Sequence, residues 1–162
     1  MKCSRRGART LALGLAGCLV LAAGVSDAAA QGKKSDSVVK AAAKADKPGP
    51  DGQQTITVTL DVSKPWHLYA NPVGNKDLAD IETTVTVTGK TKPESVKVEY
   101  PAGKVKKDAT VGDYKIYEDT VTIKVRVRRA KNDTGPLSLS VKFQACNENT
   151  CLLPATIKLT VP

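Results

Sequence analysis

The sequence has few of the side chains that carry most enzymatic and metal chemistry. Its 162 residues include one histidine, one tryptophan, one phenylalanine and one methionine, beside four cysteines. It has no glycine-rich phosphate-binding loop, no histidine-based metal motif and no serine nucleophile elbow, so nucleotide-dependent and hydrolytic functions are not indicated. With His67 as the single histidine, most hydrolase mechanisms lack their base. No cofactor is predicted.

The first 30 residues have the three parts of a secretory signal peptide. Basic residues precede an apolar stretch from Thr10 to Val25, and Ala28-Ala29-Ala30 follows as a small-residue cleavage site. The apolar stretch is too short and too rich in glycine to argue for a permanent membrane span. We therefore expect residues 1–30 to be removed and the mature chain to begin at Gln31.

A bacterial lipobox is the alternative interpretation of the same segment. Leu15-Ala16-Gly17-Cys18 fits this motif, in which the cysteine is lipidated and becomes the new N-terminus. The apolar run before Cys18 is short and continues beyond it, which favours soluble export, so membrane attachment is expected only if Cys18 is lipidated. In both cases the domain is exported, as to the periplasm, where disulfides persist. Cys146 and Cys151 then remain to pair with each other or with another protein.

Residues 31–52 lack the apolar content that a core requires. They are rich in alanine, lysine, aspartate, glycine and proline, and Val38 and Val39 are their only large apolar side chains. We expect a flexible linker over residues 31–52 and a folded domain over residues 53–162. The full chain has a net charge of +9, but its basic residues follow no nucleic-acid-binding motif, so nucleic acid is not a predicted partner.

From residue 53 onward, apolar and polar residues alternate with the period of two that is typical of half-buried strands. Turn-forming residues separate these runs. About seven or eight short strands indicate an all-β fold, an immunoglobulin-like β-sandwich, with a small barrel as the alternative. Trp66 and Phe143 are the expected large core anchors. The alternating or apolar runs cover residues 55–62, 66–69, 85–87, 96–100, 121–128, 137–143 and 157–161.

The candidate functional site is the stretch between Phe143 and Pro154. Cys146 and Cys151 flank four polar, turn-forming residues, and strand-like runs lead in and out, which predicts a hairpin. Cysteines at the two shoulders of a hairpin can lie within the ~4.4–6.8 Å Cα separation of a disulfide. The pair is therefore expected at a loop tip that a partner can reach, either bonded or open.

The spacing leaves several roles for this pair open. A disulfide that closes a ring of about six residues stabilises by only ~2 kcal/mol in the chain-entropy model, and an exposed bond of this kind suits thiol–disulfide exchange. The alternative is a structural disulfide that staples a hairpin in a non-enzymatic binding or scaffold module. A thiol metal site is a third, weaker possibility, because structural zinc needs four ligands. Lys142 favours a thiolate and Glu148 opposes it, so the reactivity of the pair stays open.

Three stretches, taken in their order, carry a resemblance to a known family. They are Trp66-His67-Leu68-Tyr69, Gly112 followed by residues 115–119 (KIYED), and Phe143-Gln144-Ala145-Cys146 followed by residues 151–156 (CLLPAT). With them, the chain from about residue 54 to residue 162 resembles the N-terminal periplasmic domain of the thiol:disulfide interchange protein DsbD.

The resemblance implies an immunoglobulin-like fold and an oxidoreductase-type thiol:disulfide interchange activity. The cysteine pair of that family relays electrons from a thioredoxin-like domain to periplasmic disulfide isomerases and cytochrome c maturation proteins. By resemblance, Cys151 forms mixed disulfides with partners and Cys146 resolves them. Tyr69 and His67 match positions beside the pair, and a loop that caps the cysteines matches residues 108–112, beginning at Asp108.

The sequence departs from the family pattern in three places. Four residues separate the two cysteines, where well-known members have five. The cap position usually filled by an aromatic falls near Thr110, and Tyr114 is the candidate to replace it. The chain ends at Pro162 without a membrane electron conduit or a thioredoxin-like domain, so we expect its electrons to come from a separate protein.

Overall fold

The computed structural model describes residues 32–162, and β-strands dominate this part of the chain. The predicted signal peptide, its cleavage site and Cys18 lie outside the described residues. Within residues 32–162 no helix is long and apolar enough to cross a membrane. The elements are η1 (Ser35–Ser37), β1 (Val39–Ala45), β2 (Gln53–Val62), β3 (His67–Tyr69), η2 (Lys76–Ile81), β4 (Thr84–Gly89), β5 (Ser95–Glu99), β6 (Lys104–Lys106), β7 (Tyr114–Tyr117), β8 (Thr120–Arg128), β9 (Leu137–Phe143), β10 (Ala145–Cys146) and β11 (Ala155–Val161).

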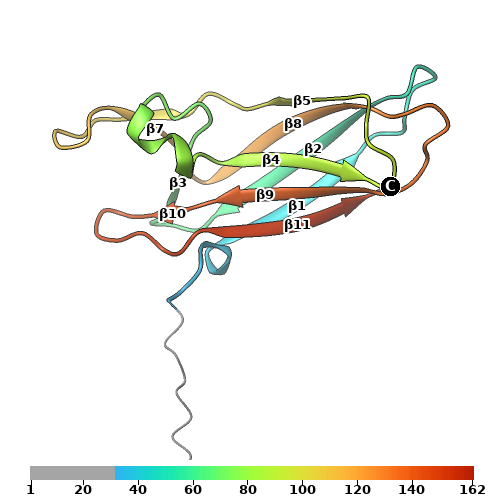
Figure 1. Cartoon of the computed structure of the whole chain (residues 1–162). Helices are drawn as coiled ribbons and strands as arrows, with labels where there is room; N and C mark the ends of the chain where they lie inside the picture. The colour runs from blue at the N-terminus through green and yellow to red at the C-terminus, as the bar shows by residue number, and fades with distance from the viewer. Residues whose placement is uncertain (1–31) are drawn as a thin grey trace, which may run out of the picture. The chain divides into compact units, whose positions relative to one another are not determined.

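Two sheets face each other to form a β-sandwich (Figure 1). One sheet has the strand order β1-β2-β8-β5, and the other has the order β11-β9-β4. All neighbouring strands are antiparallel. The immunoglobulin-like, all-β prediction is therefore confirmed.

The period-two pattern places one face of each long strand in the core. In β2, Ile56, Val58 and Leu60 are fully buried, while the threonines between them are partly exposed. The apolar residues of β8 and β9 are buried in the same way, and β-branched residues suit such half-buried strands. Phe143 is buried as expected, but Trp66 is only partly buried at the edge of the core.

The prediction of a flexible linker over residues 31–52 is wrong for its central part. β1 pairs with β2 along its whole length, from Val39 opposite Val62 to Ala45 opposite Ile56. Val38 and Val39 are buried, and alternate alanines of β1 pack against the core. The reason is that small alanine side chains are sufficient to cover the core beside β2, although they carry little hydrophobic signal.

A third, smaller sheet lies at one end of the sandwich and holds the short strands in the order β10-β3-β7-β6. β3, β7 and β10 are at the left in Figure 1, and the C-terminus lies at the opposite end. These short strands bring the described residues to eleven strands, compared with the seven or eight expected. They are too short for a period-two signal, yet β10 carries Cys146, the first cysteine of the pair.

Candidate functional site

A disulfide between Cys146 and Cys151 closes the loop that follows β10, with Cα atoms 4.0 Å apart. The loop tip is an asparagine turn. The backbone N–H of Asn147 donates to the carbonyl of Thr150 at 2.9 Å, and the Asn147 side-chain oxygen accepts from the N–H groups of Asn149 and Thr150. Asparagine favours such turns because its side chain can replace a backbone acceptor. The predicted hairpin is present, since β9 and β11 pair on either side of this loop.

The two sulfur-bearing residues differ in exposure. Cys146 is 2% exposed and belongs to a small buried cluster, whereas Cys151 is exposed. Cys146 is held by β3, where it lies directly opposite His67. An incoming thiolate therefore reaches Cys151 more readily than Cys146.

Three aromatic side chains predicted as neighbours of the disulfide lie together beside Cys146. The ring centroids of His67 and Tyr69 are 6.1 Å apart, edge to face, and those of Tyr69 and Tyr114 are 5.7 Å apart. The Tyr69 hydroxyl lies 3.6 Å from Sγ of Cys146. Because a disulfide sulfur carries no proton, the hydroxyl is the donor and the sulfur the acceptor.

Burial sets the protonation of these groups. It lowers the pKa of His67 below its ordinary value of 6.5, and the positive charge of Lys106 lowers it further, so the imidazole is neutral at neutral pH. Burial also raises the pKa of Tyr69 above its ordinary value of 10, with Tyr114 adding to the effect. The Tyr69 hydroxyl therefore keeps its proton and remains a donor toward Cys146.

An ion pair joins the cysteine loop to β6. Nζ of Lys106 lies 2.7 Å from a carboxylate oxygen of Glu148, and this hydrogen bond lowers the pKa of Glu148. Sequence reasoning assigned the local cation to Lys142, but Lys106 is the lysine that the fold brings to the loop. The sequence holds no signal for this contact, since the two residues are 42 positions apart.

The predicted cap segment, residues 108–112, forms a compact turn between β6 and β7. The Asp108 carboxylate accepts from the N–H groups of Thr110 and Val111 at 2.8 and 3.0 Å, and these bonds lower the pKa of Asp108. Gly112 has a φ of 84°, a conformation that glycine adopts without strain. The side chain of Asn75 also donates to the Val111 carbonyl at 2.7 Å.

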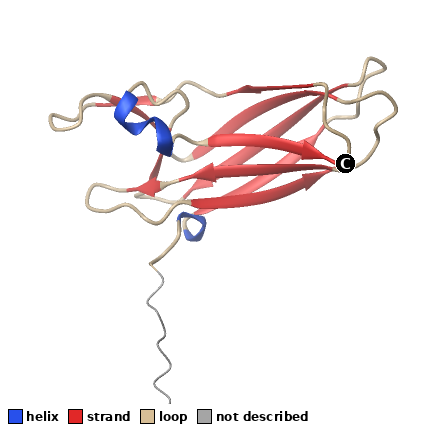
Figure 2. Cartoon of the chain, in the orientation of Figure 1, coloured by secondary structure: helices blue, strands red, loops and turns tan. Residues whose placement is uncertain are grey.

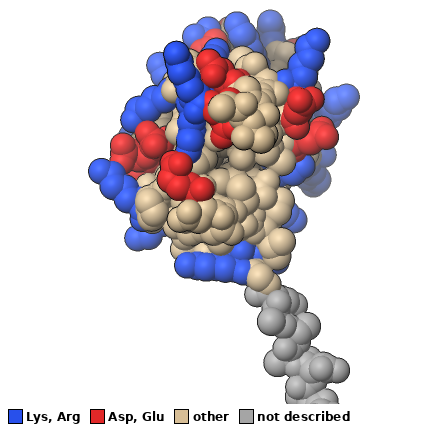
Figure 3. All heavy atoms as spheres, turned by 90° about the vertical axis from the view of Figure 1, so that its left-hand side faces the viewer, with Lys and Arg blue, Asp and Glu red and all other residues tan. Residues whose placement is uncertain are grey.

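The two predicted cap residues differ in their relation to the disulfide. The negative charge of Asp108 adds to the rise in the pKa of Tyr69 and opposes the lowering of the pKa of Glu148. Thr110 is exposed on the turn, whereas Tyr114 is buried in the same small cluster as Cys146. The cap turn and the cysteine loop project from the same end of the domain (Figures 1 and 2). Viewed from that end, basic and acidic groups lie side by side above an uncharged surface (Figure 3).

Sequence reasoning missed the N-terminal contact to the site. Ser35 is fully buried, and its hydroxyl lies between the backbone of Ala145, before Cys146, and that of Leu153, after Cys151. The inward residues of β1 are largely alanines, so the sequence gives little signal that this region is folded. Nothing in the sequence identifies Ser35 itself.

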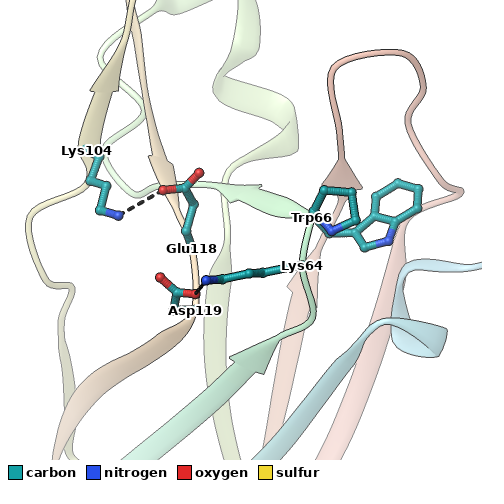
Figure 4. A pocket seen from close by; sticks show the side chains of 6 residues that line it. Lys64, Trp66, Lys104, Glu118 and Asp119 are labelled. Carbon is teal, nitrogen blue, oxygen red and sulfur yellow. Dashed lines mark hydrogen bonds and ion pairs between the residues drawn. The ribbon is translucent and has the colours of Figure 1, made fainter.

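The depression beside Trp66 presents fewer reactive groups than the cysteine loop does (Figure 4). Lys104 and Lys64, which line it, are paired with Glu118 and Asp119 at 2.9 and 3.8 Å. Each cation faces its own carboxylate, so no unbalanced charge converges on a ligand. Among residues 32–162, no group of three or more His, Cys, Asp or Glu side chains could hold a metal ion.

The fold and the site define the class of protein: an immunoglobulin-like β-sandwich domain that carries a half-exposed disulfide on a loop at one end. A family model described as "Thiol:disulfide interchange protein DsbD, N-terminal" matches residues 35–161, and the chain belongs to this family of thiol:disulfide interchange domains. The family match begins at Ser35, within the region expected to be a linker.

The chain is similar to several solved structures. The chain is similar to the N-terminal periplasmic domain of ScsB from Proteus mirabilis, with 17% identity and a TM-score of 0.54, over 75% of this chain and 46% of that one. It is also similar to the reduced N-terminal domain of DsbD from Neisseria meningitidis, with 15% identity, a TM-score of 0.48 and coverage of 78% and 86%. A third is the complex of the DsbD and PilB N-terminal domains of Neisseria meningitidis, with 14% identity, a TM-score of 0.48 and coverage of 74% and 80%. No curated protein matches the sequence.

Proposed function

We propose that the chain is an exported module that passes electrons through Cys146 and Cys151, from a thioredoxin-like donor to periplasmic acceptor proteins. The observation that carries the proposal is the difference between the two cysteines. Cys151 is exposed, whereas Cys146 is buried and lies beside the hydroxyl of Tyr69, a hydrogen-bond donor. Family membership supports the reaction class. Disulfide isomerases and cytochrome c maturation proteins are the expected acceptors.

The geometry supports an order of bond changes. A donor thiolate attacks Sγ of Cys151, the Cys146–Cys151 bond breaks, and its electron pair leaves on Cys146. The Tyr69 hydroxyl stabilises the Cys146 thiolate with a hydrogen bond. The second thiolate of the donor then attacks the donor's own sulfur in the mixed disulfide and releases Cys151. The donor is now a disulfide, and the module is a dithiol that has gained two electrons and two protons.

The same asymmetry serves the return step. The Cys151 thiolate attacks the disulfide of an acceptor, which releases one acceptor thiolate and forms a new mixed disulfide. Cys146 attacks Sγ of Cys151 and releases the acceptor as a dithiol. His67 lies opposite Cys146 in the pairing of β10 with β3. Both steps use only thiols and disulfides, so the proposal needs no cofactor or metal.

Export and domain limits are part of the same proposal. Residues 1–30 act as the signal peptide, the exchange domain begins near residue 35, and the protein works in the periplasm. Attachment to the membrane depends on lipidation of Cys18.

Two single-cysteine variants test the proposal. In Cys146→Ser the exposed Cys151 remains, and in Cys151→Ser the buried Cys146 remains. Each exported variant is mixed with a thioredoxin-like protein that carries one cysteine activated as an aromatic disulfide, and formation of the mixed disulfide is followed by mass. We expect Cys146→Ser to react at least about tenfold faster, because a nucleophilic thiolate must be accessible.

Equal slow reaction of both folded variants would contradict the proposal. In that case the disulfide is a structural staple, and the domain is a binding or scaffold module. Circular dichroism of both variants checks that the β-sandwich is intact.

A further inference from the structure

Residues 33–35 lie across the base of the cysteine loop, and we call them the strap. The Ser35 hydroxyl accepts a hydrogen bond from the N–H of Ala145 at 2.9 Å and donates one to the carbonyl of Leu153 at 2.8 Å. The Ser35 N–H also donates to the Leu153 carbonyl at 2.9 Å, and the Leu153 N–H donates to the Lys33 carbonyl at 3.2 Å. Ser35 is 0% exposed, so water cannot replace these bonds.

The strap joins the same two flanks as the disulfide does. Ala145 directly precedes Cys146, and Leu153 follows Cys151 by two residues. A single serine hydroxyl therefore connects the two ends of the loop by noncovalent bonds, beside the covalent bond between the sulfurs. One backbone bond at the base, from the Leu152 N–H to the Ala145 carbonyl at 2.9 Å, supports the same closure.

Two restraints that close the same loop stabilise each other. When the strap holds Ala145 and Leu153, the two thiols of the reduced loop meet more often, and forming the disulfide costs less chain entropy. The reverse also holds by thermodynamic linkage: the disulfide fixes the loop ends and strengthens the strap. Any such coupling appears in the equilibrium between dithiol and disulfide.

We propose that Ser35 is a positioning residue for the exchange reaction, and that the strap sets how readily the Cys146–Cys151 disulfide is reduced. The proposal rests on the exchange function proposed above. In the reaction, two glutathione thiols give two electrons and two protons to the disulfide, forming glutathione disulfide and the dithiol. Without the Ser35 hydroxyl, this equilibrium moves toward the dithiol, because the reduced loop is no longer held in the geometry that closes the bond.

The test compares Ser35→Ala with Ser37→Ala in the exported protein. Ser37 is the control for loss of a nearby serine hydroxyl, because its exposed hydroxyl donates to the carbonyl of Lys34 in the strap at 2.6 Å, whereas only the Ser35 hydroxyl bonds both Ala145 and Leu153. Each protein is equilibrated with reduced and oxidised glutathione, and its thiols are counted by alkylation and mass. We expect Ser35→Ala to shift the equilibrium constant toward the dithiol by about five- to tenfold, or about 20 to 30 mV, and Ser37→Ala to shift it by less than about twofold.

A folded Ser35→Ala protein with the wild-type equilibrium constant would overturn the role of the strap. The absolute potential of the wild type tests the exchange function separately, because the strap concerns only the difference between variant and wild type. A purely structural Ser35 would lower the stability of both redox forms equally and leave the potential unchanged.

Hydrogen exchange in the wild type provides a second test that does not depend on the variant folding. The amides of Ala145 and Leu153 donate to the strap. We expect both to exchange about five- to tenfold faster in the reduced protein, while the amide of Leu139 in β9 keeps its rate. Equal rates for the strap amides in both redox forms would contradict the inference.

Discussion

Tyr69→Phe removes the donor to Cys146 and leaves the aromatic ring in place. The hydroxyl lies 3.6 Å from the sulfur of Cys146, which in the proposed order of bond changes becomes the leaving thiolate when a donor attacks Cys151. Contacts of the ring with His67 and Tyr114 do not need the hydroxyl, so the buried cluster should persist. The variant therefore isolates one hydrogen bond at the reacting atoms.

The size of the effect follows from the change in charge on Cys146. A hydrogen bond to a neutral acceptor contributes about 0.5–1.5 kcal/mol, and one to a charged group about 1.5–3 kcal/mol. Since the charge on the leaving sulfur is only partly developed in the transition state, we expect about 1 kcal/mol of transition-state stabilisation to be lost. This corresponds to reduction that is about fivefold slower.

The assay is reduction of the disulfide by excess dithiothreitol, quenched by alkylation at set times and followed by mass. Tyr114→Phe is the matched control, because it removes a neighbouring hydroxyl that has no hydrogen bond to the disulfide, and its rate should stay within about twofold of wild type. The pKa of Tyr69 is raised, so the ratio of wild-type to Tyr69→Phe rates should stay constant between about pH 7 and 9. A folded Tyr69→Phe protein that is reduced at the wild-type rate would refute the assignment of Cys146 as the leaving group.

Three further predictions concern pH, salt and stability. The pKa of His67 is lowered in the folded protein, so the unfolded chain binds the proton more readily, and the free energy of unfolding should fall as the pH drops below 6.5. His67→Gln should weaken this pH dependence in urea titrations, and an unchanged dependence of the unfolding free energy on pH would contradict the prediction. The ion pair between Lys106 and Glu148 restrains the cysteine loop, so Lys106→Gln should speed reduction of the disulfide by dithiothreitol by a few-fold at most. Because salt screens the same ion pair, 1 M salt should bring the wild-type rate close to that of the variant. Arg129→Ala should cost about 3–5 kcal/mol in chemical denaturation, because it removes a buried guanidinium that lies 3.6 Å from the Asp133 carboxylate; a loss below about 1 kcal/mol would show that this pair is not structural.

Alternation of side chains predicted the long strands because the core of a sandwich is built from alternate residues. Ile56, Val58 and Leu60 in β2 and the valines of β8 follow this rule, and their burial is as expected. β1 was missed because its inward residues are largely alanines, which favour neither a strand nor a core by composition. Trp66 was expected as a large core anchor but is only partly buried against the core, since period and size alone do not locate a residue along the sandwich.

The site was only partly predictable for a different physical reason. Cys146 and Cys151 are close in sequence, so the turn between them could be predicted from local chemistry. The contacts that surround them are long-range: Ser35 is 110 residues from Ala145, and Lys106 is 42 residues from Glu148. Only the folded chain brings these groups together, since each pairing depends on the register of several strands.

The reduction potential of the Cys146–Cys151 pair is the most direct test of the exchange function. The exported protein is equilibrated in thiol redox buffers, and its free thiols are counted by alkylation and mass. The account predicts a potential in the range of known exchange proteins, roughly −120 to −270 mV, together with rapid reduction by a thioredoxin-like donor. A potential below about −300 mV with slow exchange would contradict it and would identify the disulfide as a structural staple.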